Sequence, residues 1–237
     1  MTLLAIQNKN FFKHTWFKVE WNLGKRCNYD CSYCDIGTHD NFSPHMSFDV
    51  WKNTVDKILN STNKKVKLSI TGGEPYINPN IIEMFKYAKD SGVHNISVVT
   101  NGTAPLSKYE KSFDFVDSFT LSYHFEFADK EKLLKKVVQF HRELILHRTS
   151  NGKKNAKDFI IHIMFLPGHL AQVEEAIDLF KKNNILYIIR RIRPQKDPNS
   201  LSWLKPYSSG MTGTHKKKSL VKESYYSQKE IDWITNV

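Results

Sequence analysis

The stretch that decides the fold holds every cysteine of this 237-residue chain, in the spacing C-x3-C-x2-C: Arg26-Cys27-Asn28-Tyr29-Asp30-Cys31-Ser32-Tyr33-Cys34. A disulfide framework needs an even number of cysteines spread through a small secreted chain, and this chain has neither property. Three thiolates on one loop can instead bind three irons of a cubane [4Fe–4S] cluster and leave the fourth iron open to a small molecule. We therefore interpret this stretch as an iron–sulfur loop.

Zinc is the alternative metal for the cysteine loop. His39 and His45 follow the cysteines, and a Cys3His set would satisfy the tetrahedral coordination that zinc prefers. Zinc sites of this kind usually consist of two separated ligand pairs, which this chain does not show. Three buried structural thiols are a weaker alternative, because Asn28, Asp30 and Ser32 make the loop polar. An iron–sulfur cluster is the interpretation that we favour.

A second motif follows about forty residues downstream of the cysteines, where the apolar run Lys67–Thr71 leads into Gly72-Gly73-Glu74-Pro75. Adjacent glycines leave the backbone uncovered, so a ligand can approach the main chain closely. Glu74 adds a carboxylate that can accept from an ammonium group, and Pro75 stiffens the exit. Alone, these four residues would indicate an ordinary turn. Their position after the cysteine loop is what favours a binding role.

Together the two motifs resemble those of the radical S-adenosylmethionine (radical SAM) enzymes. That family carries C-x3-C-x-aromatic-C, with Tyr33 in the aromatic position here, and a Gly-Gly-Glu-Pro strand end that binds the methionyl amino group of SAM. The resemblance covers roughly residues 15–193 and does not identify a subfamily. It implies that SAM chelates the open iron of a cluster held by Cys27, Cys31 and Cys34. One electron then cleaves SAM to a 5′-deoxyadenosyl radical, which abstracts hydrogen from a substrate.

Six strand-like runs alternate with helical patterns. The runs are rich in Val, Ile, Phe and Tyr, as expected of strands buried between helices; they are Trp16–Asn22, Val66–Thr71, Asn95–Thr100, Ser118–Tyr123, Phe159–Phe165 and Leu186–Ile192. Helical patterns cover Ser47–Asn60 (with Ser47 as N-cap and an apolar stripe that includes Val50), Pro79–Lys89, Asp129–Arg148 and Leu170–Lys182. The pattern alone predicts a parallel α/β fold, and the resemblance implies a partial, open (β/α)6 barrel.

The chain divides into two parts. Residues 1–193 are expected to form the barrel core, and residues 194–237 an irregular, basic C-terminal extension that is substrate-facing or truncated. Repeated prolines and glycines break any long helix in the extension, before a short helix that Ser227 would cap. No cysteine follows Cys34, so we expect no auxiliary cluster unless the chain is a fragment of a longer protein.

Other candidate site residues follow the predicted strands, because active-site residues of parallel α/β barrels gather at the C-terminal strand ends. Ser122 lies where related enzymes place a polar residue against the SAM ribose, and His124 shares its face of the strand. An inward-facing arginine could clamp the methionine carboxylate, and we prefer Arg190 to Arg191. The structural alternatives are a core serine at Ser122, a structural histidine at His124 and a left-handed turn at Asn101. The expected cofactor-binding residues are Tyr33, Gly72, Gly73, Glu74, Pro75, Asn101, Ser122, His124 and Arg190.

Composition indicates the partners. The net charge of +11, from 35 basic and 24 acidic residues, favours anionic partners such as a nucleotide, a phosphorylated metabolite or RNA. We expect a small-molecule or anionic substrate, and the residues do not distinguish a sugar nucleotide from a peptide. RNA is a minority alternative, because no RNA-binding module accompanies the charge. The resemblance also implies an electron donor such as flavodoxin or ferredoxin. No run is long enough to cross a bilayer and no signal-peptide core is present, so we expect a cytoplasmic location. A non-catalytic SAM- or cluster-binding module and a zinc-stabilised nucleic-acid-binding protein remain alternative functions.

Overall fold

The computed structural model describes residues 15–34, 39–152, 158–192 and 226–236. Six parallel strands form one sheet in which each strand pairs with the next along the chain: β1 (Trp16–Asn22), β2 (Lys65–Thr71), β3 (Asn95–Thr100), β4 (Ser118–Tyr123), β5 (Phe159–Phe165) and β6 (Leu186–Arg191). Within the described residues β1 and β6 do not pair, so the barrel is open. The predicted partial (β/α)6 barrel is therefore confirmed.

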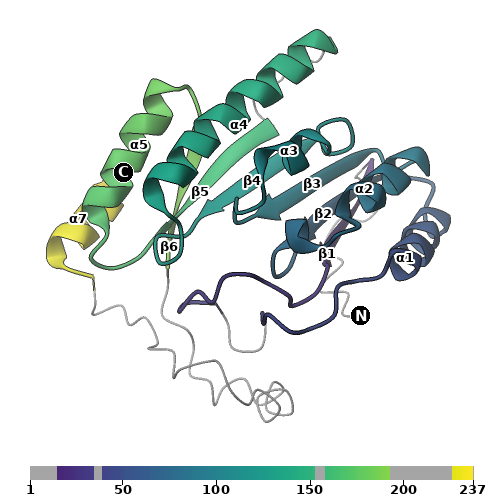
Figure 1. Ribbon diagram of the computed structural model, residues 1–237, viewed down its shortest axis with the longest axis horizontal. Coiled ribbons are helices and arrows are strands. Elements are labelled where there is room, and N and C mark those ends of the chain that lie inside the picture. The colour runs from purple at the N-terminus through teal and green to yellow at the C-terminus, as the bar shows by residue number, and fades with distance from the viewer. Residues whose placement is uncertain (1–14, 35–38, 153–157, 193–225, 237) are drawn as a thin grey trace.

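Helices connect the strands and lie along one side of the sheet, while the dark purple segment after β1 runs apart from them (Figure 1). They are α1 (Phe48–Asn60), the 3-10 turn η1 (Pro75–Ile77), α2 (Ile81–Asp90), α3 (Leu106–Glu110), α4 (Lys130–Ser150), α5 (Leu170–Lys182) and α7 (Gln228–Asn236). Ser47 caps α1 as predicted, since its side chain accepts from the Val50 N–H at 3.3 Å. Pro79 lies before α2, whose N-cap is Asn80, so the predicted start was two residues early. The sequence missed α3 and η1, because such short elements show no helical period.

The face of the sheet that carries the helices is the hydrophobic core. Leu68, Ile70 and Ile163 are completely buried on it. Trp21 of β1 stacks on Trp51 of α1 with ring centroids 4.4 Å apart. The predicted apolar stripe of α1 is narrower than expected, because Val50 is 45% exposed. Because successive side chains of a strand point to opposite faces, every second side chain of each strand belongs to the core.

The opposite face of the sheet, here called the inner face, is mostly polar on β1 to β4 and partly open, whereas its β5 and β6 positions include the exposed Leu186 and Ile188. It consists of the alternate strand positions, such as Lys18 and Glu20 on β1 and Ser69 on β2. Both β1 residues are exposed, so the expectation that the strands are buried between helices is wrong for this face. The reason is that the helices cover only one side of an open barrel.

The last described segment, residues 226–236, packs against the end of β5. The Tyr226 hydroxyl lies 2.9 Å from both the Phe165 and the Ile192 carbonyl oxygens. Glu230 accepts from the Gly168 N–H at 2.6 Å, and Figure 1 shows α7, in yellow, beside α5. Ser227 accepts from the Glu230 N–H at 3.3 Å, which confirms the predicted cap. Residues 194–225 of the predicted extension lie outside the described residues.

In the part of the chain that the structure describes, no helix is both long enough and apolar enough to cross a membrane.

Candidate active site

The C-terminal ends of β1 to β4 surround a cleft of about 240 Å³. All three cysteines line it, together with residues from these strand ends and from the connection between β1 and α1: Asn22, Tyr29, His39, Thr71, Gly72, Gly73, Val99, Thr100, Asn101, Ser122 and His124. The sequence predicted that thiols, glycines and the β4 side chains would meet at one edge of the sheet. They do meet there, although the contacts of each residue with a cofactor stay predictions.

Backbone hydrogen bonds hold the first part of the cysteine loop in place. The Cys27 N–H donates to the Asp40 carbonyl at 2.6 Å, and the Asp40 N–H donates to the Lys25 carbonyl at 2.9 Å. On the other side, the Glu74 N–H donates to the Arg26 carbonyl at 2.8 Å. The loop is therefore attached both to the chain that returns toward α1 and to the glycine motif.

Gly72 and Gly73 allow this close contact between two backbones. A Cβ on Gly73 would lie 2.0 Å from the Arg26 carbonyl oxygen, and one on Gly72 would lie 2.2 Å from Asn22 Oδ1. Gly72 also has a φ of +103°, which disfavours other residues. The sequence attributed the glycines to a ligand that approaches the backbone. The structure gives a second reason for them, because the strand end packs against the cysteine loop. The approach of a ligand to their backbone stays a prediction.

Glu74 joins the end of β2 to the end of β3. Its Oε1 accepts from the Tyr76 N–H at 2.9 Å and from the Thr100 hydroxyl at 2.7 Å, and its Oε2 accepts from the Asn101 N–H at 2.6 Å. The side chain is buried, and burial raises the pKa of this carboxyl to about 7. Glu74 does not line the cleft that contains the cysteines. Its predicted contact with the SAM ammonium group stays a prediction.

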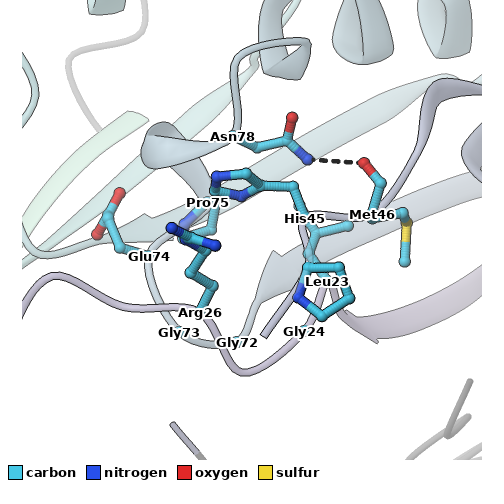
Figure 2. A pocket seen from close by; sticks show the side chains of 11 residues that line it. Leu23, Gly24, Arg26, His45, Met46, Gly72, Gly73, Glu74, Pro75 and Asn78 are labelled. Atoms are coloured by element: carbon cyan, nitrogen blue, oxygen red, sulfur yellow. Dashed lines mark hydrogen bonds between the residues drawn. The ribbon is translucent and has the colours of Figure 1, made fainter. Parts of the chain in front are cut away.

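A second, smaller pocket lies behind the glycine motif (Figure 2). Glu74 and Pro75 line it, the Arg26 and His45 side chains lie beside each other in it, and Asn78 donates to the Met46 carbonyl at 3.0 Å. Burial, with the charges of Arg26 and Lys108, lowers the pKa of His45. The volume of about 20 Å³ accommodates one water, so this pocket is too small for SAM.

Asn101 connects β3 to the cysteine loop. Its Nδ2 donates to Asn28 Oδ1 at 2.9 Å and lies 3.9 Å from the Cys27 sulfur. The left-handed residue of this turn is Gly102, with a φ of +77°, so the alternative of a left-handed Asn101 is wrong. Asn101 therefore orients the loop beside the first cysteine.

β4 holds the second half of the cysteine loop. His124 Nδ1 lies 2.5 Å from the Tyr33 hydroxyl and 3.4 Å from the Cys31 sulfur. Burial lowers the pKa of His124 to about 4, so the imidazole is neutral at pH 7. Glu126 accepts from the Ser32 N–H at 2.8 Å and from the Ser32 hydroxyl. Glu126 is not among the residues predicted from the sequence, although it follows β4 just as His124 does.

The register of β6 separates the two candidate arginines. Arg190 pairs with Met164 and so shares the inner face, whereas Arg191 pairs with the core residue Phe165. The Arg191 guanidinium lies over the Tyr226 ring, 5.4 Å from its centroid. Arg190 therefore lies on the same face of the sheet as Asn22 and Thr71, which line the cleft. It does not line the cleft, so its contact with the SAM carboxylate stays a prediction.

The three thiols fit an iron–sulfur cluster better than one metal ion. Among the described residues, no three His, Cys, Asp or Glu side chains converge on a point where a single metal ion could bind. A cluster instead takes each thiolate on a different iron, which suits three thiols that line one cleft. Burial raises the pKa of Cys27 to about 11, and a hydrogen bond with Cys34 and burial raise that of Cys31. Ligation must deprotonate these thiols, so cluster binding releases protons.

Of the two histidines of the zinc alternative, His39 lies at the cleft with the cysteines and His45 does not. His39 Nε2 lies 3.1 Å from Asp30 Oδ1 and lines the cleft, whereas His45 lines the small pocket behind the glycine motif. The two histidines thus belong to different cavities.

The family model of the radical SAM superfamily matches residues 21–189, and the chain therefore belongs to this superfamily. Members of the family use a [4Fe–4S] cluster and SAM. Among curated relatives, 7-carboxy-7-deazaguanine synthase of Clostridium acetobutylicum is 27% identical over 178 residues, which are 71% of this chain and 72% of the synthase. GTP 3',8-cyclase of Desulforamulus reducens is 35% identical over 81 residues, 32% of this chain and 24% of the cyclase.

Solved structures agree on the fold. Native anSMEcpe with bound AdoMet matches with a TM-score of 0.53 and 17% identity over 76% of this chain and 53% of anSMEcpe. Streptococcus suis SuiB bound to the precursor peptide SuiA matches with a TM-score of 0.54 and 16% identity over 81% of this chain and 45% of SuiB. The chain thus spans about half the length of these two proteins.

Proposed function

We propose that this protein is an enzyme that cleaves SAM reductively at a [4Fe–4S] cluster and abstracts hydrogen from an anionic small molecule. The observation that carries the proposal is the single cleft of about 240 Å³, which brings Cys27, Cys31 and Cys34 together with Gly72–Gly73 and the β4 side chains. When bound, the cluster and SAM supply a 5′-deoxyadenosyl radical. The residues of the chain bind and orient these groups and exclude competing reactions.

Each part of the cleft has a proposed role. The three thiolates hold the cluster, and the backbone of Gly72–Gly73 contacts the methionyl end of SAM. Ser122 accepts or donates at the ribose, and His124 orients the aromatic side chain of Tyr33, whose hydroxyl lies 2.5 Å from Nδ1. Arg190, on the inner face, pairs with the methionine carboxylate. An electron donor such as flavodoxin or ferredoxin supplies the reducing electron.

Charge supports an anionic substrate, because the chain carries a net charge of +11. The names of two relatives, a deazaguanine synthase and a GTP cyclase, refer to small molecules. SuiB binds a peptide, but its likeness to this chain concerns the fold alone.

Anaerobic reconstitution tests the proposed function. The reconstituted protein is expected to contain about four irons and four sulfides per chain and to release 5′-deoxyadenosine from SAM when dithionite is added. A non-catalytic module would bind SAM without releasing 5′-deoxyadenosine. A zinc protein would retain zinc and acquire no cluster. Either result would contradict the proposal.

A further inference from the structure

Below the cleft, the inner face of the sheet carries an unbroken row of hydrogen-bonding side chains. The strand registers place Glu20 of β1 opposite Ser69 of β2, Ser69 opposite Ser97 of β3, and Ser97 opposite Ser118 of β4. The Ser97 hydroxyl donates to the Ser69 hydroxyl at 3.1 Å, so these side chains project from the same face. We call Ser69, Ser97 and Ser118 the serine row. Asn22, Thr71 and Val99, two residues further along their strands, line the cleft itself.

Two lysines lie one step further from the cleft. Lys18 of β1 is in register with Lys67 of β2, and Lys67 is in register with Asn95 of β3. Lys18 is exposed and Lys67 half-buried. Like charges directly opposite on neighbouring strands repel and destabilise the sheet. Other lysines of the described chain form ion pairs with carboxylates, as in Lys86–Asp90, Lys89–Asp117 and Lys130–Glu175. An anionic group bound between Lys18 and Lys67 would remove their repulsion.

We propose that the serine row, together with Lys18 and Lys67, is the substrate-binding surface, and that the substrate is a phosphorylated, hydroxyl-bearing small molecule of the nucleotide or sugar-phosphate class. This inference rests on the proposed function, since it names the substrate of the same site. Serine hydroxyls and Glu20 bind the hydroxyl groups, because they can donate to and accept from them. The two ammonium groups bind the phosphate. Lys18 lies four residues before Asn22, about 13 Å along the strand, so the reacting carbon sits by the cleft while the phosphate lies at the lysines.

The chemistry of this surface does not suit a peptide. A peptide is usually recognised through its main chain at a sheet edge, with pockets for alternate side chains. The surface instead lies on the face of four strands, and the main-chain groups between these strands are already used in the parallel ladder. It offers hydroxyl and ammonium groups in place of main-chain partners.

A thermal-shift screen of the full chain, reconstituted anaerobically and loaded with SAM, tests the proposal. The probes are nucleoside mono-, di- and triphosphates, ribose 5-phosphate and glucose 6-phosphate, with the matching nucleosides, free sugars and an unstructured oligopeptide as counterparts. We expect shifts from phosphorylated probes and none from their counterparts. Lys67→Gln and Lys18→Gln should each lower the affinity for the best probe roughly tenfold, as expected for a lost charged hydrogen bond. Calorimetry measures this affinity. Lys86→Gln on α2 is the matched control and should not change the affinity.

Stability separates binding from a structural role. Because Lys18 and Lys67 repel each other, the two glutamine variants should melt at the same or a higher temperature than the parent in the absence of probe. Shifts from the peptide or from unphosphorylated counterparts would overturn the proposal, as would shifts that both glutamine variants retain. The absence of any shift, as expected if another segment of this chain covers the face, would overturn it too. Failure of the proposed function shows separately, as a lack of 5′-deoxyadenosine.

Discussion

The two faces of the sheet are made from the same strands yet differ in almost every property. On the core face, Leu68 and Ile70 of β2 are fully buried against helices. On the inner face, their neighbours Lys67 and Ser69 are polar and half-buried. Since successive side chains of a strand point to opposite faces, one strand supplies the core and the site at once. The strands therefore fix the positions of the site residues with the same packing that stabilises the fold.

The difference shows where each kind of substitution should act. A change on the core face alters the free energy of unfolding first and the chemistry only indirectly. A change at the inner face or the strand ends alters binding first, because those side chains contribute little apolar burial. Four sets of substitutions test this contrast, beginning with the set that should have the largest effect.

The cysteines should show the clearest separation of chemistry from stability. Replacement of Cys27, Cys31 or Cys34 by Ala is expected to abolish SAM cleavage and to remove most of the cluster, because each thiolate holds a different iron. Iron and sulfide analysis after reconstitution, with 5′-deoxyadenosine measured by chromatography, checks this. The unloaded variants should melt near the parent temperature, since the loop is also held by the Cys27–Asp40 and Glu74–Arg26 backbone bonds. A triple variant that kept the brown colour and iron content would contradict the assignment.

Gly73 lies where the strand end meets the cysteine loop and should affect both properties. In Gly73→Ala the new Cβ would lie 2.0 Å from the Arg26 carbonyl oxygen, so the backbone next to Cys27 must move. We expect a stability loss of about 1–3 kcal/mol, as for overpacking, and a reduced cluster content. Chemical denaturation and iron analysis measure the two effects.

Gly92→Ala is the matched control for Gly73. Gly92 has a φ of +107° but nothing within 4 Å of the added Cβ. Gly92→Ala should lower the free energy of unfolding by about 1–2 kcal/mol, because alanine disfavours the left-handed conformation. It should still bind a full cluster. Equal cluster content in the two variants would show that cluster binding does not depend on the contact between Gly73 and Arg26.

Much of this arrangement could be predicted from the sequence, because it depends on local patterns. The bounds of β1, β3, β4, β5 and α5 agree with their predicted runs, since a strand or helix of ordinary length shows its period. The meeting of cysteines, glycines and β4 residues followed from the rule that parallel strands end at one edge. The reason for Gly73 could not be predicted, because its contact with Arg26 joins residues 47 positions apart and depends on tertiary packing. The open inner face depends on which side the helices cover, and periodicity alone cannot show that.

The pair Leu68 and Ser69 compares the two faces at neighbouring positions of β2. Leu68→Ala should lower the free energy of unfolding by about 2–5 kcal/mol, because it leaves a cavity in a fully buried site. Ser69→Ala removes one hydroxyl that accepts from Ser97 and should cost about 1 kcal/mol or less. Urea denaturation of the unloaded protein measures both. Similar losses for the two variants would show that the inner face is as tightly packed as the core.

Glu74 belongs to both regions, since it is buried like a core residue yet fastens the strand ends of the site, and its effect should depend on pH. Burial raises its pKa from 4.5 to about 7 in the folded protein. Between these values the folded state keeps a proton that the unfolded state releases, so the contribution of Glu74 to stability is complete below pH 4.5 and is lost as pH rises through 7. A shift of this size corresponds to about 3 kcal/mol.

Glu74→Gln removes this titration, and the comparison isolates it from other groups. The free energy of unfolding of the parent minus that of the variant should fall by up to about 3 kcal/mol from pH 4.5 to pH 7 and stay constant above pH 8. Urea titrations of both unloaded proteins across this range measure the difference. A difference that did not change with pH would mean that the hydrogen bonds from Tyr76, Thr100 and Asn101 outweigh burial and keep the carboxylate ionised. Glu74 would then act as a charged anchor of the strand ends.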